Sequence, residues 1–375
     1  MDVKRFVEIL DTKFYTGVPD SLLRPLCDYL MKTYGISENH IVAANEGNCT
    51  ALAAGHYLAT GEIPLVYMQN SGLGNMLNPA VSLLHKKVYA IPCIFVVGWR
   101  GEPGVPDEPQ HLYQGEITLK LLEDMGIKPF IISTDTTDKE LMELMELSKP
   151  LLAKGNSVAF VIRKGALTYD DKLLYGNLYQ MTRESIIECV TEVSGEDVII
   201  STTGKASREL FEIRERRAQG HGRDFLTVGS MGHSSSIALG IALAKPGEKV
   251  WCIDGDGAAL MHMGAMAVIG SRKPSNLIHV VINNEAHETV GGVPTAAKDA
   301  GLAEIAAACG YPWSETVTGR EDLKKALRAA KENERLAFIE VKAAIGARAD
   351  LGRPATTTEE NKRSFMEYMR GRKNE

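Results

Sequence analysis

Short runs of β-branched and other apolar residues alternate with segments of helical periodicity along all 375 residues of the chain. This alternation is typical of βαβ units, in which helices connect the strands of a parallel sheet. The chain is about two to three times as long as a usual domain, so we predict two α/β domains, each with a doubly wound parallel sheet. The expected strands are 41–44, 64–68, 91–97, 130–133 and 158–162 in the first half, and 198–201, 225–228, 249–254, 277–282 and 337–341 in the second.

A polar stretch without clear periodicity separates the two halves and is the best candidate for a linker. We therefore place the two domains at 1–168 and 184–375 and the linker at 169–183. The C-terminal segment 356–375 has the pattern of a charged amphipathic helix. Its apolar residues could dock on a neighbour, and they are Phe365, Tyr368 and Met369.

Composition and charge exclude several classes of partner. The chain has 42 Lys and Arg against 48 Asp and Glu, a formal net charge of −6, which argues against nucleic acid. The six cysteines are far apart and form no CxxC pair, which favours reduced thiols over a zinc site or disulfides. The first ten residues carry four charges, and the longest apolar stretch, around 89–99, is too short to cross a bilayer. We expect a soluble cytoplasmic protein without nucleic-acid or membrane partners.

A glycine turn follows one of the predicted buried strands. The segment KVWCIDGDGAALMHMG runs from that strand into Gly255, Asp256 and Gly257 and then into a helix. Glycines at the carboxyl edge of a parallel sheet let backbone N–H groups and a helix N-terminus approach a phosphate closely. A carboxylate there would repel a diphosphate unless a cation lay between them. Asp256 is therefore a candidate ligand for Mg2+.

The next predicted strand, LIHVVINN, ends in Asn283 and Asn284. Because neighbouring parallel strands end side by side, an asparagine amide oxygen there can reach the same ion. Either motif alone can equally be an ordinary turn after a strand. A dinucleotide site is less favoured, because Leu260 stands where the GxGxxG fingerprint needs its third glycine.

Together, GDG at 255–257 and NN at 283–284, with 25 residues between them, resemble the motif of thiamine diphosphate enzymes. The resemblance implies that the side chains of Asp256 and Asn284 and the backbone carbonyl of Ala286 bind Mg2+. The residues that would then lie at the diphosphate are Gly255, Gly257, Ala258 and His287.

Enzymes of this family also need a buried carboxylic acid. It hydrogen-bonds to the aminopyrimidine ring, so that the cofactor can remove its own C2 proton. The segment NEGNCTALAAGHYLATG offers Glu46 just after a predicted strand, at the start of a helix rich in small residues. By itself, a glutamate there could simply complement the helix dipole. Beside GDG and NN, it resembles the catalytic glutamate of the pyruvate decarboxylase group.

The family further needs a bulky apolar residue that holds the cofactor bent. In FLTVGSMGHSSSIALGIAL, Met231 stands at the matching place, and the Gly229 carbonyl is positioned for the 4′-amino group. Core filling is the more usual role of a methionine. In relatives, the two domains that share a cofactor come from different chains. The resemblance therefore implies a homo-oligomer with the cofactor at the subunit interface.

Three further segments resemble the phosphonopyruvate decarboxylase family, and the likeness covers nearly the whole chain. They are FYTGVPDSLL at 14–23, QNSGLGN at 69–75 and ADLGRP at 349–354. The short linker leaves no room for the third domain of larger relatives. The resemblance implies a lyase of phosphonate biosynthesis that converts 3-phosphonopyruvate to phosphonoacetaldehyde and CO2. Sulfopyruvate or another 3-anionic 2-oxo acid stays open as the substrate, and so does a cofactor-binding protein without turnover.

Two residues are candidates for roles close to the substrate. Asp20 could take part in proton transfer, or could belong to the N-cap region of a helix. His111 lies in a Gly- and Pro-rich loop that could close over the substrate. A phosphonate also needs cationic or N–H donors. The cationic candidates are Arg100, His111, Lys205, His287, Arg348 and Arg353.

Overall fold

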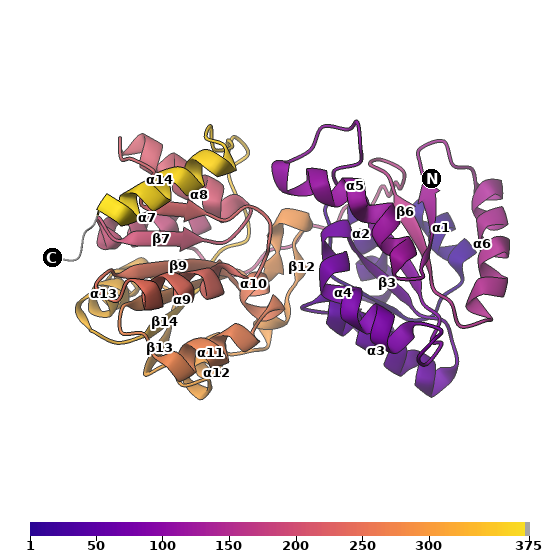
Figure 1. Cartoon of the computed structure of the whole chain (residues 1–375), viewed down its shortest axis with the longest axis horizontal. Coiled ribbons are helices and arrows are strands. Elements are labelled where there is room, and N and C mark those ends of the chain that lie inside the picture. Colours follow the sequence, from indigo (N-terminus) through magenta and orange to yellow (C-terminus); the bar gives the residue numbers. More distant parts are fainter. Residues whose placement is uncertain (372–375) are drawn as a thin grey trace. The chain divides into compact units, whose positions relative to one another are not determined.

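The computed structural model describes residues 1–371, and its contacts divide the chain into two compact units. The first unit is Met1–Tyr175 with Val290–Val293, and the second is Gly176–Thr289 with the residues from Pro294 onward. Each unit contains one six-stranded parallel sheet with helices packed on it (Figure 1). The predicted fold of two doubly wound α/β domains is confirmed, and the described residues contain no third domain between them.

In the first unit the strand order is β2-β1-β3-β4-β6-β5, and all neighbours are parallel. The strand order reverses between β1 and β3, and ligands of doubly wound sheets bind outside the carboxyl ends of strands at such a switch point. The strands are β1 Tyr15–Gly17, β2 His40–Val42, β3 Leu65–Gln69, β4 Ile94–Gly98, β5 Lys128–Ile132 and β6 Val158–Ile162. The helices are α1 Val3–Leu10, α2 Arg24–Tyr34, α3 Glu46–Thr60, η1 Asn70–Gly72, α4 Leu73–Pro79, η2 Ala80–Leu84, α5 Pro109–Asp124 and α6 Asp138–Leu152.

In the second unit the order is β13-β14-β10-β9-β7-β8, again all parallel, with the switch point between β7 and β9. The strands of this sheet are β7 Val198–Ser201, β8 Asp224–Leu226, β9 Val250–Gly255, β10 Leu277–Asn283, β13 Trp313–Val317 and β14 Ala337–Lys342. The helices are α7 Arg183–Ser194, α8 Lys205–Arg216, α9 Ser234–Ala244, α10 Asp256–Met261, α11 Gly264–Arg272, η4 Ala296–Lys298, α12 Leu302–Ala308, α13 Arg320–Glu332 and α14 Thr358–Gly371. The segment in which the chain passes from the second unit to the first and back contains η3 Glu288–Val290 and the two strands of a small ribbon, β11 Ala286–His287 and β12 Val293–Pro294.

Each sheet contains one strand that the sequence pattern does not indicate. β1 is only three residues long and is followed within two residues by Pro19, so it lacks a recognisable apolar run. β13 lies at a sheet edge and is only partly buried, so its sequence WSETV is mostly polar. Central strands such as β4 and β6 are buried throughout, because helices cover both faces of the sheet, and these strands are apparent from sequence.

The predicted C-terminal helix forms as α14 and docks on its own unit. Phe365 and Met369 are buried in that unit's core, and the Phe365 ring lies 5.7 Å from that of Phe225. The side chain of Asn361 accepts a hydrogen bond from Leu226 N and donates one to Asp224 O, which fixes the helix against β8. Residues 372–375 of the predicted helix lie outside the described part of the chain.

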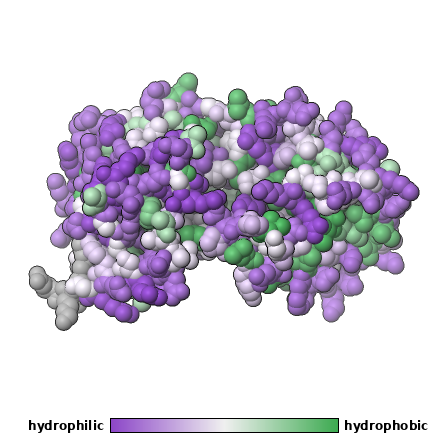
Figure 2. Space-filling view, turned by 90° about the horizontal axis from the view of Figure 1, so that it is seen from above, coloured by the Kyte–Doolittle hydropathy of each residue, from purple (hydrophilic) through white to green (hydrophobic). Residues whose placement is uncertain are grey.

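The face shown in Figure 2 is mostly hydrophilic, with smaller apolar areas between the polar ones. Within residues 1–371, no helix combines the length and the apolar character that crossing a bilayer would require.

Candidate active site

The GDG and NN motifs lie side by side at the carboxyl edge of the second sheet. Gly255 at the end of β9 is paired in register with Ile282, so Asp256 and Asn284 both follow directly beyond the sheet. Asp256 begins α10, and its relative exposure is 4% against 6% for Asn284. This edge lies beside the switch point, and it presents a carboxylate and an amide, which are the oxygen ligands that Mg2+ prefers.

The surroundings of Asp256 suit a cation. Thr295 Oγ1 donates to Asp256 Oδ2 at 2.7 Å, and burial raises the pKa of Asp256 to about 6. Within residues 1–371 no lysine or arginine forms an ion pair with this carboxylate. A divalent cation would compensate the buried charge.

The turn after β10 brings Asn284 and Ala286 together. Glu285 has a φ of 62°, a left-handed conformation that is uncommon for residues other than glycine. Its backbone N–H donates to Asn283 Oδ1 at 3.0 Å, and Ala286 N donates to Asn284 Oδ1 at 3.2 Å. The chain therefore reverses so tightly that the proposed side-chain and backbone ligands belong to one turn.

Met231, Gly257 and His287 converge on one point beside this turn. A Cβ placed on Gly257 would lie 3.3 Å from Met231 Cε and 3.2 Å from His287 Cε1, so glycine admits both side chains. Packing around His287 lowers its pKa to about 4, which keeps the imidazole neutral at pH 7. Gly229 and Ser230 have φ values of 71° and 46°, and Thr203 Oγ1 accepts a hydrogen bond from Gly229 N at 2.9 Å. Gly255 ends β9, and Ala258 lies in the first turn of α10.

In the first unit, Glu46 is the first residue of α3 and is 4% exposed. Asn75 Nδ2 donates to its Oε2 at 2.7 Å. Burial raises the pKa of Glu46, which favours the protonated form. A protonated carboxylic acid can donate a hydrogen bond to a ring nitrogen, as thiamine diphosphate requires.

Asp20 follows β1 and is completely buried. Its carboxylate accepts hydrogen bonds from Gln69 Nε2 at 2.7 Å and from the backbone N–H groups of Leu22 and Leu23 at 3.2 and 3.3 Å. Burial raises the pKa of Asp20 despite these donors. The carboxyl group is therefore held in one orientation at the switch point between β1 and β3.

One segment, Gln69–Asn75, connects the polar groups of this edge. Gln69 binds Asp20, Asn75 binds Glu46, and Asn70 exchanges two hydrogen bonds with the backbone of Arg100. The roles of Gln69 and Asn75 as hydrogen-bond partners are not apparent from residue type alone. Their signal in the sequence is the QNSGLGN segment that resembles the decarboxylase family.

The expectation that His111 lies in the Gly- and Pro-rich loop is wrong, because α5 already begins at Pro109 and His111 belongs to its first turn. The His111 side chain is buried, and its Nδ1 has no hydrogen-bond partner in the described part of the chain. Burial, with the nearby charge of Arg100, lowers its pKa. Hydrogen bonds of Asp107 hold the two ends of the loop before α5 together. Asp107 accepts two hydrogen bonds from Arg100 and one each from Gly101 N and Glu108 N. Closure of this loop over a substrate stays a prediction.

Comparison with known proteins identifies the family. Residues 4–123 match the N-terminal TPP binding domain of thiamine pyrophosphate enzymes, and residues 202–341 match the C-terminal TPP binding domain. The chain is 33% identical to phosphonopyruvate decarboxylase of Streptomyces viridochromogenes, over 94% of this chain and 90% of the relative. The chain belongs to the phosphonopyruvate decarboxylase family of thiamine pyrophosphate enzymes. It is less similar to sulfopyruvate decarboxylase of Methanosarcina acetivorans, at 28% identity over 89% of this chain and 90% of that relative.

Thiamine diphosphate, another name for thiamine pyrophosphate, is the cofactor of this family, and both units offer groups that fit it. The first holds a buried carboxyl group at Glu46, whose pKa burial raises. The second combines Asp256 and Asn284 with the glycine cradle at Gly257.

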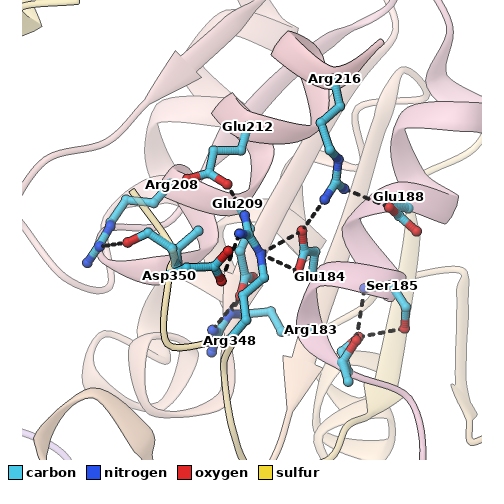
Figure 3. Close-up of polar contacts among 12 residues, drawn as sticks. Arg183, Glu184, Ser185, Glu188, Arg208, Glu209, Glu212, Arg216, Arg348 and Asp350 are labelled. Carbon is cyan, nitrogen blue, oxygen red and sulfur yellow. Dashed lines mark hydrogen bonds and ion pairs between the residues drawn. The ribbon is translucent and has the colours of Figure 1, made fainter. Parts of the chain in front are cut away.

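Three of the cationic candidates form ion pairs within their own unit. Arg100 is paired with Asp107, and Lys205 Nζ lies 2.9 Å from Glu288 Oε1. Arg348 contacts Glu184, Glu212 and Asp350, as Figure 3 shows. The adjacent backbone of Leu351 and Gly352 accepts hydrogen bonds from Arg208. The ADLGRP segment is thus attached to α7 and α8 through charged residues. These residues are distant from one another in the sequence.

Gly72 provides a test of the Glu46 geometry. A Cβ at Gly72 would lie 2.5 Å from Glu46 Cγ and Oε1, so Gly72→Ala must displace that carboxyl group. We expect kcat to fall by at least about tenfold, because small displacements of a catalytic group are costly. Gly74→Ala is the matched control, since no atom lies within 4 Å of its Cβ position. Equal kcat values for the two variants would contradict this geometry.

Proposed function

We propose that this chain decarboxylates 3-phosphonopyruvate to phosphonoacetaldehyde and CO2, using thiamine diphosphate and Mg2+. The main support is that one chain combines a buried Glu46, whose pKa burial raises, with the Asp256–Asn284 edge, and resembles phosphonopyruvate decarboxylases over nearly its whole length. We assign the pyrimidine to domain 1–168 and the diphosphate to domain 184–375, joined by the linker 169–183. A cytoplasmic role in phosphonate biosynthesis is part of the proposal.

When bound, thiamine diphosphate supplies the electron sink for the carbon–carbon bond that breaks. In our proposal, Glu46 donates a hydrogen bond to the pyrimidine ring, and Met231 packs between the two rings. Asp256, Asn284 and the Ala286 carbonyl hold Mg2+. The remaining cofactor contacts are the Gly229 carbonyl to the 4′-amino group, and Gly255, Gly257, Ala258 and His287 at the diphosphate.

Asp20 and His111 are proposed to act on the substrate. When CO2 leaves, a proton must be added to the carbon atom that carried it. Burial raises the pKa of Asp20, which favours its protonated form, and that form can deliver the proton. Burial and the charge of Arg100 lower the pKa of His111, so a neutral His111 can donate or accept a hydrogen bond.

We further propose a homo-oligomer in which the Glu46 domain of one subunit and the Asp256 domain of another share each cofactor. Exposed apolar side chains on neighbouring helices of the first unit support a subunit interface there. Leu52 and Leu58 on α3, Leu77 on α4 and Val81 on η2 are exposed apolar side chains. Exposed apolar groups on adjacent helices are typical of protein–protein contacts.

Sulfopyruvate is the second candidate substrate, because the chain also resembles sulfopyruvate decarboxylase of Methanosarcina acetivorans over most of its length. Both substrates carry an anionic group on the carbon next to the 2-oxo group. The two therefore make similar demands on cationic and N–H donors.

The test is CO2 release by the purified protein with Mg2+ and thiamine diphosphate, measured in parallel with phosphonopyruvate, sulfopyruvate and pyruvate. We expect kcat/KM to be highest for phosphonopyruvate, and EDTA with removal of the cofactor to abolish release. Release of CO2 from sulfopyruvate alone would show that the substrate is the sulfonate and not the phosphonate. Binding of the cofactor without release from any of the three would favour a protein without turnover.

A further inference from the structure

The carboxylate of Glu288 lies four residues after Asn284, in η3, and its side chain is only 7% exposed. It accepts hydrogen bonds from three donors of its own unit. These are Arg183 Nη1 at 2.8 Å, Lys205 Nζ at 2.9 Å and Asn284 Nδ2 at 3.0 Å. Two cations therefore compensate the negative charge of the buried Glu288 carboxylate. Its third hydrogen-bond donor is Asn284, the proposed metal ligand.

Arg183 is itself held firmly in place. Its Nε and Nη2 donate to the two carboxylate oxygens of Glu209, both at 2.7 Å, in a bidentate pair. Figure 3 shows Arg183 next to Glu209 of α8. Bidentate pairs fix both distance and plane. The position of Glu288 is therefore set by groups on α7 and α8, which flank the sheet edge, as well as by its own turn.

This arrangement determines which way the Asn284 amide points. A carboxylate only accepts hydrogen bonds, so the NH2 group of Asn284 must face Glu288. The amide oxygen then faces away from Glu288. It accepts one hydrogen bond from Ala286 N, and an amide oxygen has two lone pairs, so one stays available for a cation.

We propose that Glu288, held by Arg183 and Lys205, is a positioning residue that orients the Asn284 side chain for binding the divalent cation. The inference rests on the proposed function, because it requires Asn284 to be a metal ligand. Groups that hydrogen-bond to metal ligands typically change metal affinity by about 10- to 100-fold when they are replaced.

The test measures metal affinity, which a purely structural ion pair would leave unchanged. Mn2+ is titrated into the full chain at saturating thiamine diphosphate, and the free ion is followed by its EPR signal. In Glu288→Gln the amide side chain can donate as well as accept, so the Asn284 amide is no longer forced into one orientation. We expect its Kd for Mn2+ to rise by about tenfold or more.

Glu209→Gln is the matched control, because it removes the same charge from the same Arg183 but does not touch Asn284. We expect its Mn2+ Kd to stay within about threefold of the wild-type value. If Glu288→Gln does not fold by circular dichroism, Glu288→Asp, which keeps the charge but shortens the reach, takes its place with the same expected direction.

Unchanged affinity in the Glu288 variant, or equal losses in the Glu288 and Glu209 variants, would overturn the positioning role. A wild-type chain that binds no Mn2+ in the presence of thiamine diphosphate would overturn the proposed function instead.

Discussion

Replacing Glu46 by glutamine is expected to lower kcat by about 100-fold or more while leaving the fold intact. Glutamine keeps the size of the side chain and can still accept the hydrogen bond from Asn75. It lacks the acidic proton that we propose is shared with the pyrimidine nitrogen, and loss of such a proton-transferring group typically costs about 10²- to 10⁴-fold. The measurement is CO2 release at saturating substrate and cofactor. A variant with near-normal kcat would exclude Glu46 as the activating acid.

The same variant has an expected effect on stability that depends on pH. Burial raises the pKa of Glu46, so the folded state binds its proton more tightly than the unfolded state does. The contribution of Glu46 to the free energy of unfolding is fully present below its ordinary pKa of about 4.5 and is lost as the pH rises through the folded value. In cofactor-free protein, Glu46→Gln should therefore have a higher Tm than wild type at pH 8, and the difference should shrink towards pH 5. A difference independent of pH would contradict the assigned protonation.

Replacing Asp256 by asparagine is the second change with a large expected effect. Asparagine can still accept from Thr295 through its amide oxygen, so we expect the fold to persist. It removes the negative charge that would face the cation, and loss of one partner of a buried charge pair costs about 2–5 kcal/mol. Affinity for Mg2+ and thiamine diphosphate should fall by roughly 30-fold or more. Isothermal titration of the cofactor in the presence of Mg2+ measures this directly, and an unchanged Kd would remove Asp256 from the metal site.

The Glu46 and Asp256 variants together test the shared site. If each cofactor is held by the Glu46 domain of one subunit and the Asp256 domain of another, mixed oligomers of Glu46→Gln and Asp256→Asn contain some sites with neither change. Unfolding and refolding the two inactive variants together should then restore part of the activity. No recovery in mixed oligomers that form correctly would place both residues of each site on one chain.

Part of the fold is apparent from sequence for a simple reason. Strands buried on both faces, such as β4 and β6, need continuous apolar residues, and this requirement can be read locally. β1 and β13 are not apparent, because one is very short and the other lies at an edge where polar residues are tolerated. Their places in the sheets depend on neighbouring strands that are distant in the sequence.

The residues of the candidate site also fall into two groups, those that can be recognised from sequence and those that cannot. Asp256, Asn284 and Glu46 are recognisable as candidates, because their motifs resemble those in which the family places its metal ligands and its carboxylic acid. The groups that hold them are not recognisable in this way. Asn75 beside Glu46, Thr295 beside Asp256 and Glu288 beside Asn284 are ordinary polar residues until the chain folds.

The sequence by itself predicted the two α/β domains from local pattern, and its motifs indicated the cofactor class and the candidate residues through their resemblance to the family. Only the tertiary structure decided which charges are already paired. Arg100, Lys205 and Arg348 look alike as free cations in the sequence, yet each forms ion pairs with carboxylates. Whether a charge is available to a ligand depends on which distant side chains the fold brings within a few ångströms of it, and local sequence carries little information about that.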